Sequence, residues 1–231
     1  LDRNLFDKVT HALYLLEKLS ESSMPFIFKG GTSLLLLLQE LRRLSIDIDI
    51  IVPKSVKIAE INEILKNIVR TSSFTRYEEQ ERHYSQIPKA HFKLFYESPF
   101  DQSEVYVLLD VLFEENPYSR LDSTDIVCPF IDTIPPNVTV KVPSIADILG
   151  DKLTAFAPNT TGILYDKEKE MEIIKQLFDI ESLFDQLSTT NGVKDTFIRC
   201  AEQELNYRQL TEMNYENVLD DIFKTAIIIG G

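Results

Sequence analysis

The chain has 231 residues, 44% of them hydrophobic, and a formal net charge of −13. This length suits one large domain or two modest ones with a substantial core. A protein that grips a long polyanion normally presents a basic face, so the acidic balance argues against broad nucleic-acid binding. It is compatible with a local basic funnel for an RNA end or with a basic partner protein.

No feature of the sequence predicts a membrane or a metal-binding cysteine motif. No basic-then-apolar signal segment opens the chain, and the apolar run Leu34–Leu38 is far shorter than a bilayer span. The two cysteines, Cys128 and Cys200, have neither metal-ligand spacing nor a disulfide framework. We therefore expect a cytoplasmic protein with no membrane partner.

The first predicted element is a helix over Leu5–Leu19, where apolar residues recur at the spacing of one buried stripe. His11 lies within this helix, and we expect it at the surface rather than as a ligand.

The stretch Phe26–Ile50 predicts a short apolar strand, a Gly-Gly turn, an apolar helix and a second strand. Gly30 and Gly31 allow a sharp turn with exposed amides, and Thr32 or Ser33 can cap the following helix. The start of a helix carries free N–H groups and a partial positive charge, which makes this turn a predicted phosphate site. Lys29, directly before the glycines, either reaches that phosphate or is a solvated lysine at a strand end.

The second strand, Leu44–Val52, carries two aspartates on one face. Side chains on a strand repeat every two residues, so Ser45, Asp47 and Asp49 project together. Neighbouring carboxylates repel each other unless a cation lies between them, and Mg²⁺ accepts such ligands together with substrate phosphates. The alternative is a tight turn followed by an edge strand with two solvated aspartates.

The middle of the chain predicts a helix, a polar surface segment and a hairpin. The helix covers Val56–Thr71, residues 72–88 are polar with mixed charges, and His91–Tyr96 pairs with Glu104–Phe113. Asp110 is the one charged residue in the apolar second arm after Glu104. An ionised aspartate in such a strand is costly unless it has a partner, and the site at Asp47 and Asp49 would supply one. The alternative is an aspartate that caps a turn at a strand end.

A domain boundary is predicted near residue 142, where prolines bracket a short strand at Val138–Val142. Asp122, Asp125 and Asp132 lie before it in sequence typical of loops. Beyond it, helical periodicity predicts four helices, over Ile145–Ala157, Met171–Leu187, Val193–Asn206 and Asn217–Ile229. We therefore predict an α/β domain over residues 1–142 and a helical domain over residues 143–231.

Lys152 falls on the apolar stripe of the first of these helices. A lysine at such a position either extends its ammonium group to the rim or meets an anion. Asp147 and Asp151 share another face of this helix at i and i+4, as a mildly repulsive pair.

Three segments resemble the AbiEii/AbiGii-type nucleotidyltransferases of the DNA polymerase β-like superfamily. The first runs from Phe28-Lys29-Gly30-Gly31-Thr32 through the Leu-rich helix to Arg43-x-Ser45-x-Asp47-Ile48-Asp49. The second, residues 146–155, is similar to a later family motif in which a lysine, here Lys152, precedes Leu-x-Ala. The third, residues 175–179, keeps one aspartate of the family's Arg-x-x-Asp-x-x-Asp element as Asp179 and replaces the other with Gln176. That departure leaves Asp179 either a catalytic residue or a structural anchor.

The resemblance implies a nucleotidyltransferase core with a mixed sheet flanked by helices, followed by a helical domain. It implies Mg²⁺- or Mn²⁺-dependent transfer of a nucleoside monophosphate from a nucleoside triphosphate to RNA, notably tRNA, or to protein. It also implies the role of toxin in a bacterial toxin–antitoxin pair, with a cognate antitoxin as partner. The implied site comprises the nucleotide-binding residues Lys29, Gly30, Gly31, Thr32, Ser33 and Ser45, the metal ligands Asp47, Asp49 and Asp110, and the catalytic residues Asp110 and Lys152.

Two other functions are open at this level. A small-molecule nucleotidyltransferase of the antibiotic-modifying type would use the same core with an acidic acceptor pocket, which suits the net charge of −13. A binding protein on the same scaffold would have lost catalysis, although all three acidic residues are present.

Overall fold

The computed structural model describes residues 2–40, 43–80, 87–165 and 168–230 of the chain. These residues divide into two compact units. The first comprises residues 1–37, 43–116 and 122–142, and the second comprises residues 38–42, 117–121 and 143–231. The second unit therefore takes in two short segments from the first 142 residues, and the domain limits at 142 and 143 stay a prediction.

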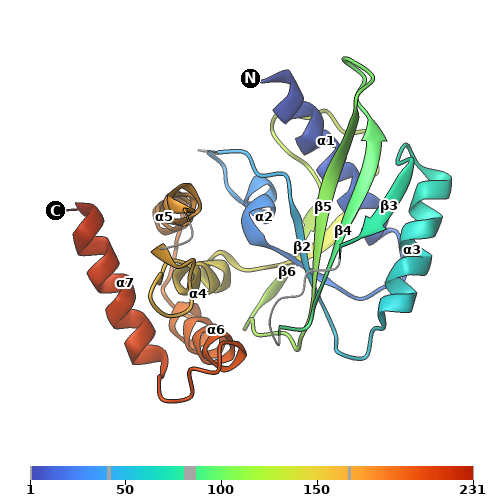
Figure 1. Ribbon diagram of the computed structural model, residues 1–231. Coiled ribbons are helices and arrows are strands. Elements are labelled where there is room, and N and C mark those ends of the chain that lie inside the picture. Colours follow the sequence, from blue (N-terminus) through green and yellow to red (C-terminus); the bar gives the residue numbers. More distant parts are fainter. Residues whose placement is uncertain (1, 41–42, 81–86, 166–167, 231) are drawn as a thin grey trace. The chain divides into compact units, whose positions relative to one another are not determined.

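A five-stranded mixed sheet forms the frame of the first unit (Figure 1). Its strand order is β1-β2-β5-β4-β3; β2 and β5 are parallel, and all other neighbours are antiparallel. The predicted mixed α/β fold is confirmed, as is the hairpin, now β4 and β5. The strands are β1 (Ile27–Lys29), β2 (Ile48–Val52), β3 (Arg76–Glu79), β4 (Lys89–Glu97) and β5 (Glu104–Phe113).

One face of this sheet packs against α1 (Arg3–Ser20) and α3 (Ile58–Thr71). The Tyr96 hydroxyl donates to Asp7 of α1 at 3.2 Å, and Tyr77 donates to a backbone carbonyl of α3 at 3.4 Å. The apolar side chains on this face are almost fully buried, and burial of each stabilises the fold by roughly 1.5–3 kcal/mol. They include Ile48, Ile50, Phe92, Leu94, Leu109 and Val111.

His11 is part of this core contact, so its predicted surface position is wrong. Its ring stacks on Tyr96 with centroids 3.5 Å apart, and its Nδ1 lies 3.1 Å from the Asp7 carboxylate. The helical spacing had identified the apolar stripe of α1 but not the polar pair beside it.

α2 (Gly30–Leu37) begins directly after β1 and is shorter than the roughly three turns of helix that the leucine-rich stretch predicts. Leu34 and Leu35 are buried, and the Thr32 hydroxyl donates to the backbone carbonyl of Asp47 at 2.6 Å. The second strand is also shorter than predicted, because β2 begins at Ile48 and leaves Asp47 just before it.

Two strands lie where the sequence predicted surface segments or loops. β3 occupies part of the polar segment after residue 72; residues 81–86, which carry the rest of its charge run, lie outside the described residues. β6 (Leu121–Asp125) pairs with β7 (Thr139–Pro143), so Asp122 and Asp125 are strand residues. Both strands that the sequence analysis missed are polar. Their backbone N–H and C=O groups are satisfied by pairing with a more apolar neighbouring strand, so these strands need no apolar face of their own.

Among the described residues, the second unit contains four α-helices, as the periodicity predicted. They are α4 (Ile145–Ala155), α5 (Glu170–Asp185), α6 (Val193–Tyr207) and α7 (Tyr215–Gly230). Ser144 caps α4 by accepting the backbone N–H of Asp147. Gly150 lets α4 and α6 approach closely, because a Cβ there would lie 2.6 Å from the carbonyl oxygen of Val193.

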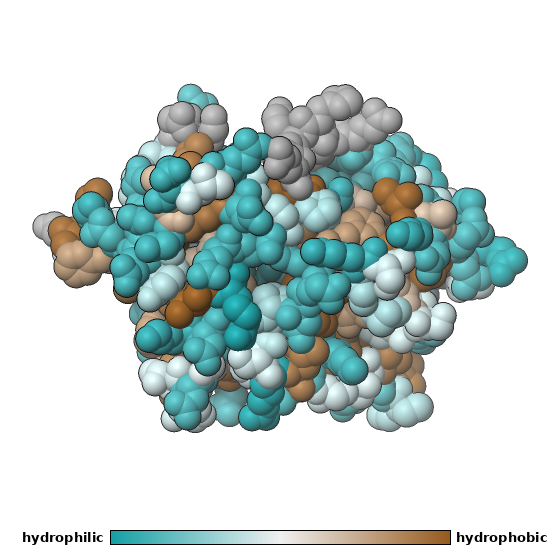
Figure 2. Space-filling view, turned by 90° about the horizontal axis from the view of Figure 1, so that it is seen from below, coloured by the Kyte–Doolittle hydropathy of each residue, from teal (hydrophilic) through white to brown (hydrophobic). Residues whose placement is uncertain are grey.

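The face of the molecule shown in Figure 2 is mainly hydrophilic, with apolar side chains at scattered positions. Within the described parts of the chain, no helix has both the length and the apolarity needed to cross a bilayer.

Candidate functional site

Four residues from four adjacent strands form one row across the sheet of the first unit. Lys29 of β1 pairs with Asp49 of β2, Asp49 pairs with Asp110 of β5, and Asp110 pairs with His91 of β4. Neighbouring strands are about 4.8 Å apart, and residues in register project from the same face. This is the face opposite Ile48 and Leu109. Two carboxylates therefore lie side by side, with a lysine on one flank and a histidine on the other.

The Asp110 carboxylate is held by His91, a residue that the sequence analysis did not single out. His91 Nδ1 lies 2.6 Å from Asp110 Oδ1, and the two side chains are 13% and 31% exposed. Asp110 was expected to need a partner in its apolar strand, and this histidine is one. The pairing of His91 with Asp110 follows from the register of the β4–β5 hairpin. The sequence pattern predicts the hairpin but not this register, because the register depends on the length and path of the loop between the two strands.

Gly30 sits directly against Asp49. Its φ is +79°, a value that glycine adopts readily and other residues resist. A Cβ at Gly30 would lie 2.2 Å from Asp49 Oδ2, closer than any real contact. The turn and the carboxylate strand therefore meet at a point where only a glycine fits.

Gly31, the second residue of the turn, is surrounded by Arg43 and Ser45. A Cβ there would lie 2.6 Å from Arg43 Nη2 and 3.1 Å from Ser45 Oγ. The segment that precedes β2 thus returns to the glycine turn and brings a guanidinium group and a hydroxyl group with it.

Thr32 and Ser33 do not cap α2 in the predicted way. Both are fully buried, and their hydroxyl groups donate to backbone carbonyls: Thr32 to Asp47 at 2.6 Å and Ser33 to Gly30 at 2.8 Å. Their side chains fasten the turn, while the first N–H groups of a helix have no partner within it. Thr32 and Ser33 therefore stabilise the turn from inside, while Gly30 and Gly31 are partly exposed.

The donor set of this row fits a divalent cation. Carboxylate oxygens are the ligands that Mg²⁺ and Mn²⁺ prefer, and the missing Cβ of Gly30 keeps space open beside Asp49. In their present orientations, no three metal-ligating side chains of the described residues are close enough to hold an ion. The register of β2 and β5 is set by the backbone, whereas the orientation of a carboxylate depends on its side-chain torsion angles, so we base the fit on the register. Asp47, two residues before Asp49, is the third candidate ligand.

Lys152 belongs to the second unit, where it forms a buried ion pair. Its Nζ lies 2.8 Å from Asp179 Oδ2 and donates to Gln176 Oε1 at 3.0 Å. The side chains of Lys152 and Asp179 are only 11% and 3% exposed. The ammonium group of Lys152, on the apolar stripe of α4, therefore forms an ion pair with a carboxylate of its own unit. Asp179 and Gln176, at the altered family element, are its partners.

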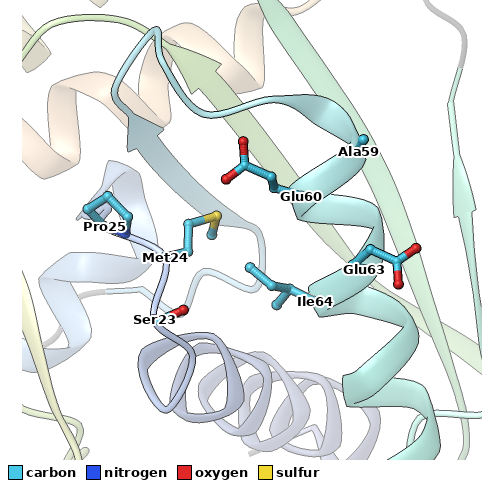
Figure 3. A pocket seen from close by; sticks show the side chains of 7 residues that line it. All are labelled: Ser23, Met24, Pro25, Ala59, Glu60, Glu63 and Ile64. Atoms are coloured by element: carbon cyan, nitrogen blue, oxygen red, sulfur yellow. The ribbon is translucent and has the colours of Figure 1, made fainter.

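A cavity of about 430 Å³ lies elsewhere in the first unit, between α3 and the segment before β1 (Figure 3). Glu60 and Glu63 line it, but Glu60 accepts the backbone N–H of Lys57 and Glu63 pairs with Lys66 at 2.6 Å. The cavity contains none of the predicted site residues, so it is not part of the candidate site.

Comparisons with known proteins identify a family and a fold. Residues 13–227 match the family described as "Nucleotidyl transferase AbiEii toxin, Type IV TA system". The structure resembles JHP933 from Helicobacter pylori, with 16% identity and a TM-score of 0.54, over 99% of this chain and 93% of that one. It also resembles an antigenic nucleotidyltransferase-like protein from Paracoccidioides brasiliensis, with 14% identity and a TM-score of 0.54, over 89% and 91% of the two chains. No curated protein sequence matches the chain.

Proposed function

The chain belongs to the AbiEii family of nucleotidyltransferase toxins of type IV toxin–antitoxin systems, and from this premise we propose where and how it transfers a nucleotide. The site is the row of Asp49 and Asp110 beside the glycine turn. The observation that carries this proposal is the register pairing of the two carboxylates, with Gly30 packed against one of them.

The glycine turn would bind the triphosphate. The partly exposed Gly30 and Gly31 would offer their backbone N–H groups, whereas Thr32 and Ser33 are buried, have their hydroxyl groups in use and would support the turn. Lys29 stands in the same row as the carboxylates, where its ammonium group would reach a phosphate oxygen. Ser45 next to Gly31 would donate its hydroxyl to the nucleotide.

The three aspartates Asp47, Asp49 and Asp110 would hold Mg²⁺ or Mn²⁺. When bound, such an ion neutralises phosphate charge and orients the α-phosphorus for in-line attack. Asp110 would accept the proton of the attacking hydroxyl group. The bond from the acceptor oxygen to the α-phosphorus forms as the bond to the pyrophosphate oxygen breaks. The catalytic role of Lys152 stays a prediction, because its ammonium group pairs with Asp179 within the second unit.

The acceptor we propose is RNA, with tRNA ends first, or protein. The net charge of −13 argues against a broad RNA-binding face and restricts the contact to an RNA end. A family of toxins also implies an antitoxin partner, and we place the reaction in the cytoplasm. The same charge favours a second candidate, a cationic small-molecule acceptor such as an aminoglycoside.

Labelled nucleotides test the activity and the acceptor together. The purified protein is incubated with each α-labelled nucleoside triphosphate, Mg²⁺, and either tRNA, total protein or an aminoglycoside, and the products are identified by mass spectrometry. We expect label on tRNA or protein in the wild type and none with Asp47→Asn, which keeps the fold because Asp47 is partly exposed. Asp132→Asn, in an exposed loop, is the matched control and should keep full transfer.

Three results would contradict the proposal in different ways. Label on the aminoglycoside alone would show that the acceptor is a small molecule and not RNA or protein. Absence of label from every acceptor would support the alternative that the chain is an inactive binding protein. Calorimetry that gave equal Mg²⁺–nucleotide affinity for the wild type and Asp47→Asn would refute the metal assignment.

A further inference from the structure

We propose that His91 is a positioning residue for Asp110. Its Nδ1–H holds one carboxylate oxygen, so that the other is presented to the reacting groups in a defined orientation. This inference rests on the proposed function, because it assigns a role within the same site. The sequence analysis did not single out His91.

The first support is the contact itself. The 2.6 Å separation between His91 Nδ1 and Asp110 Oδ1 is short for a hydrogen bond between nitrogen and oxygen, as expected when the acceptor is ionised. A carboxylate can only accept, so the proton lies on Nδ1 and a neutral ring keeps its lone pair on Nε2. The contact therefore specifies one tautomer of His91.

The second support is the rigidity of the frame that carries the two side chains. They are direct partners in β4 and β5, and their strand neighbours Phe92 and Leu109 are fully buried on the opposite face. At 13% exposure the histidine ring is largely shielded from water, which would otherwise compete for the carboxylate. The backbone thus sets the separation, and the hydrogen bond then restricts rotation of the Asp110 carboxylate.

The third support is the order of residues in the row. Asp110 stands between Asp49 on β2 and His91 on β4. A hydrogen bond from the β4 side occupies Oδ1 and leaves Oδ2 for a group shared with Asp49. Partners that orient a ligating carboxylate typically change metal affinity or activity by about 10–100-fold when they are removed.

The first test reads the tautomer without any enzymatic assay. The chain has three histidines, and ¹⁵N–¹H spectra of ¹⁵N-histidine-labelled protein distinguish Nδ1–H from Nε2–H rings. We expect Nδ1–H signals from His91 and from His11, whose Nδ1 also lies 3.1 Å from a carboxylate, and only the His91 signal should disappear in His91→Asn. An Nε2–H ring at His91 would overturn the proposal.

The second test compares two amide variants that place their N–H groups differently. The side-chain amide of His91→Asn overlays Nδ1 and can still donate to Asp110, whereas that of His91→Gln overlays Nε2 and cannot. We expect His91→Gln to lose roughly tenfold or more in Mn²⁺ affinity by calorimetry, and His91→Asn to stay close to the wild type. In nucleotide transfer, His91→Gln should lower kcat and leave KM for the nucleoside triphosphate nearly unchanged.

These measurements separate the inference from the proposed function. If the wild type binds Mn²⁺ and transfers nucleotides, and both variants match it, the role of His91 is refuted and the proposed function stands. If both variants lose affinity equally, the donor position does not matter and the positioning role is likewise refuted. If the wild type neither binds Mn²⁺ nor transfers nucleotides, both proposals fall.

Discussion

At the scale of single residues, the glycine turn depends on one position more than on the other. Gly30 combines a positive φ with a Cβ position 2.2 Å from Asp49, whereas the nearest atom to a Gly31 Cβ is the end of a flexible arginine. Gly30→Ala should cost roughly 1–3 kcal/mol, with Tm falling by about 2–4 °C for each kcal/mol, and should abolish transfer. Gly31→Ala should stay near the wild-type Tm, because Arg43 can move. Thermal unfolding of both variants checks this, and equal losses would contradict it.

A second residue-scale prediction concerns Tyr96, whose pKa is raised above its usual range by burial and, after that, by the Asp7 carboxylate. In the unfolded chain this phenol ionises near pH 10, whereas in the folded chain it keeps its proton. The resulting stabilisation is complete below about pH 10 and is lost as the pH rises further. Urea unfolding at several pH values should show a steeper loss above pH 10 for the wild type than for Tyr96→Phe. Parallel curves would show that Tyr96 is not the group responsible.

At the scale of elements, α7 is a helix in which several of the regularly spaced apolar side chains are exposed to solvent. Leu219, Phe223 and Ile227 are 53–63% exposed, while Asp221 and Thr225 are buried. Asp221 accepts three hydrogen bonds of 2.7–2.8 Å from Asn159 and Thr160. The spacing over Asn217–Ile229 therefore predicted the helix correctly, but the buried face combines Val218, which belongs to an apolar cluster, with the polar residues Asp221 and Thr225.

This arrangement reverses the usual effect of substitutions on an amphipathic helix. Phe223→Ser should change the free energy of unfolding by less than about 0.5 kcal/mol, because the side chain is largely exposed. Asp221→Ala leaves buried donors without an acceptor and should cost about 2–3 kcal/mol. Urea unfolding of the two variants measures both effects, and a larger loss for Phe223→Ser would contradict the assignment of the buried face.

The ion pair between α4 and α5 changes what is expected of Lys152→Met. On an apolar stripe with no anion nearby, this substitution would stabilise the nucleotide-free protein. With Asp179 buried 2.8 Å from the ammonium group, it should instead cost about 3–5 kcal/mol. Lys152→Met combined with Asp179→Asn removes both charges and should recover most of that loss in thermal unfolding.

Single-turnover kinetics on the double variant then separate a catalytic lysine from a structural one. If Lys152 acts on the phosphates, turnover stays low after stability is recovered. If turnover recovers together with stability, the lysine serves the fold alone.

At the scale of the whole molecule, Asp147 joins distant parts of the chain within the second unit. It is 1% exposed and accepts from the backbone N–H groups of Ser119 and Arg120 and from the hydroxyls of Ser144 and Thr196, at 2.5–3.1 Å. This explains why residues 117–121 belong to the second unit. The sequence indicated only a mildly repulsive pair with Asp151.

Asp147→Ala should therefore be among the most damaging substitutions in the second unit. Four donors lose one shared acceptor, so we expect a loss of at least about 3 kcal/mol and easier proteolytic cleavage near residue 119. Asp151→Ala removes one acceptor, for the Tyr118 hydroxyl at 2.8 Å, and should cost about 1 kcal/mol. Thermal unfolding and limited proteolysis measure these effects. Similar losses in both variants would contradict the conclusion that Asp147 joins distant segments of the second unit.

Local sequence patterns were sufficient to predict the elements that carry their own periodicity and the site residues that are neighbours along the chain. The helices, the hairpin, the mixed α/β class and the meeting of the Gly30 turn with the aspartate strand all follow from local patterns and from the family motif. Contacts between residues that are distant along the chain became known only from the folded structure. His91 with Asp110, Lys152 with Asp179, and Asp147 with residues 119 and 120 depend on strand register and helix packing. The physical reason is that periodicity within one element reports which face is apolar, whereas the partner of a buried polar group is set by another element.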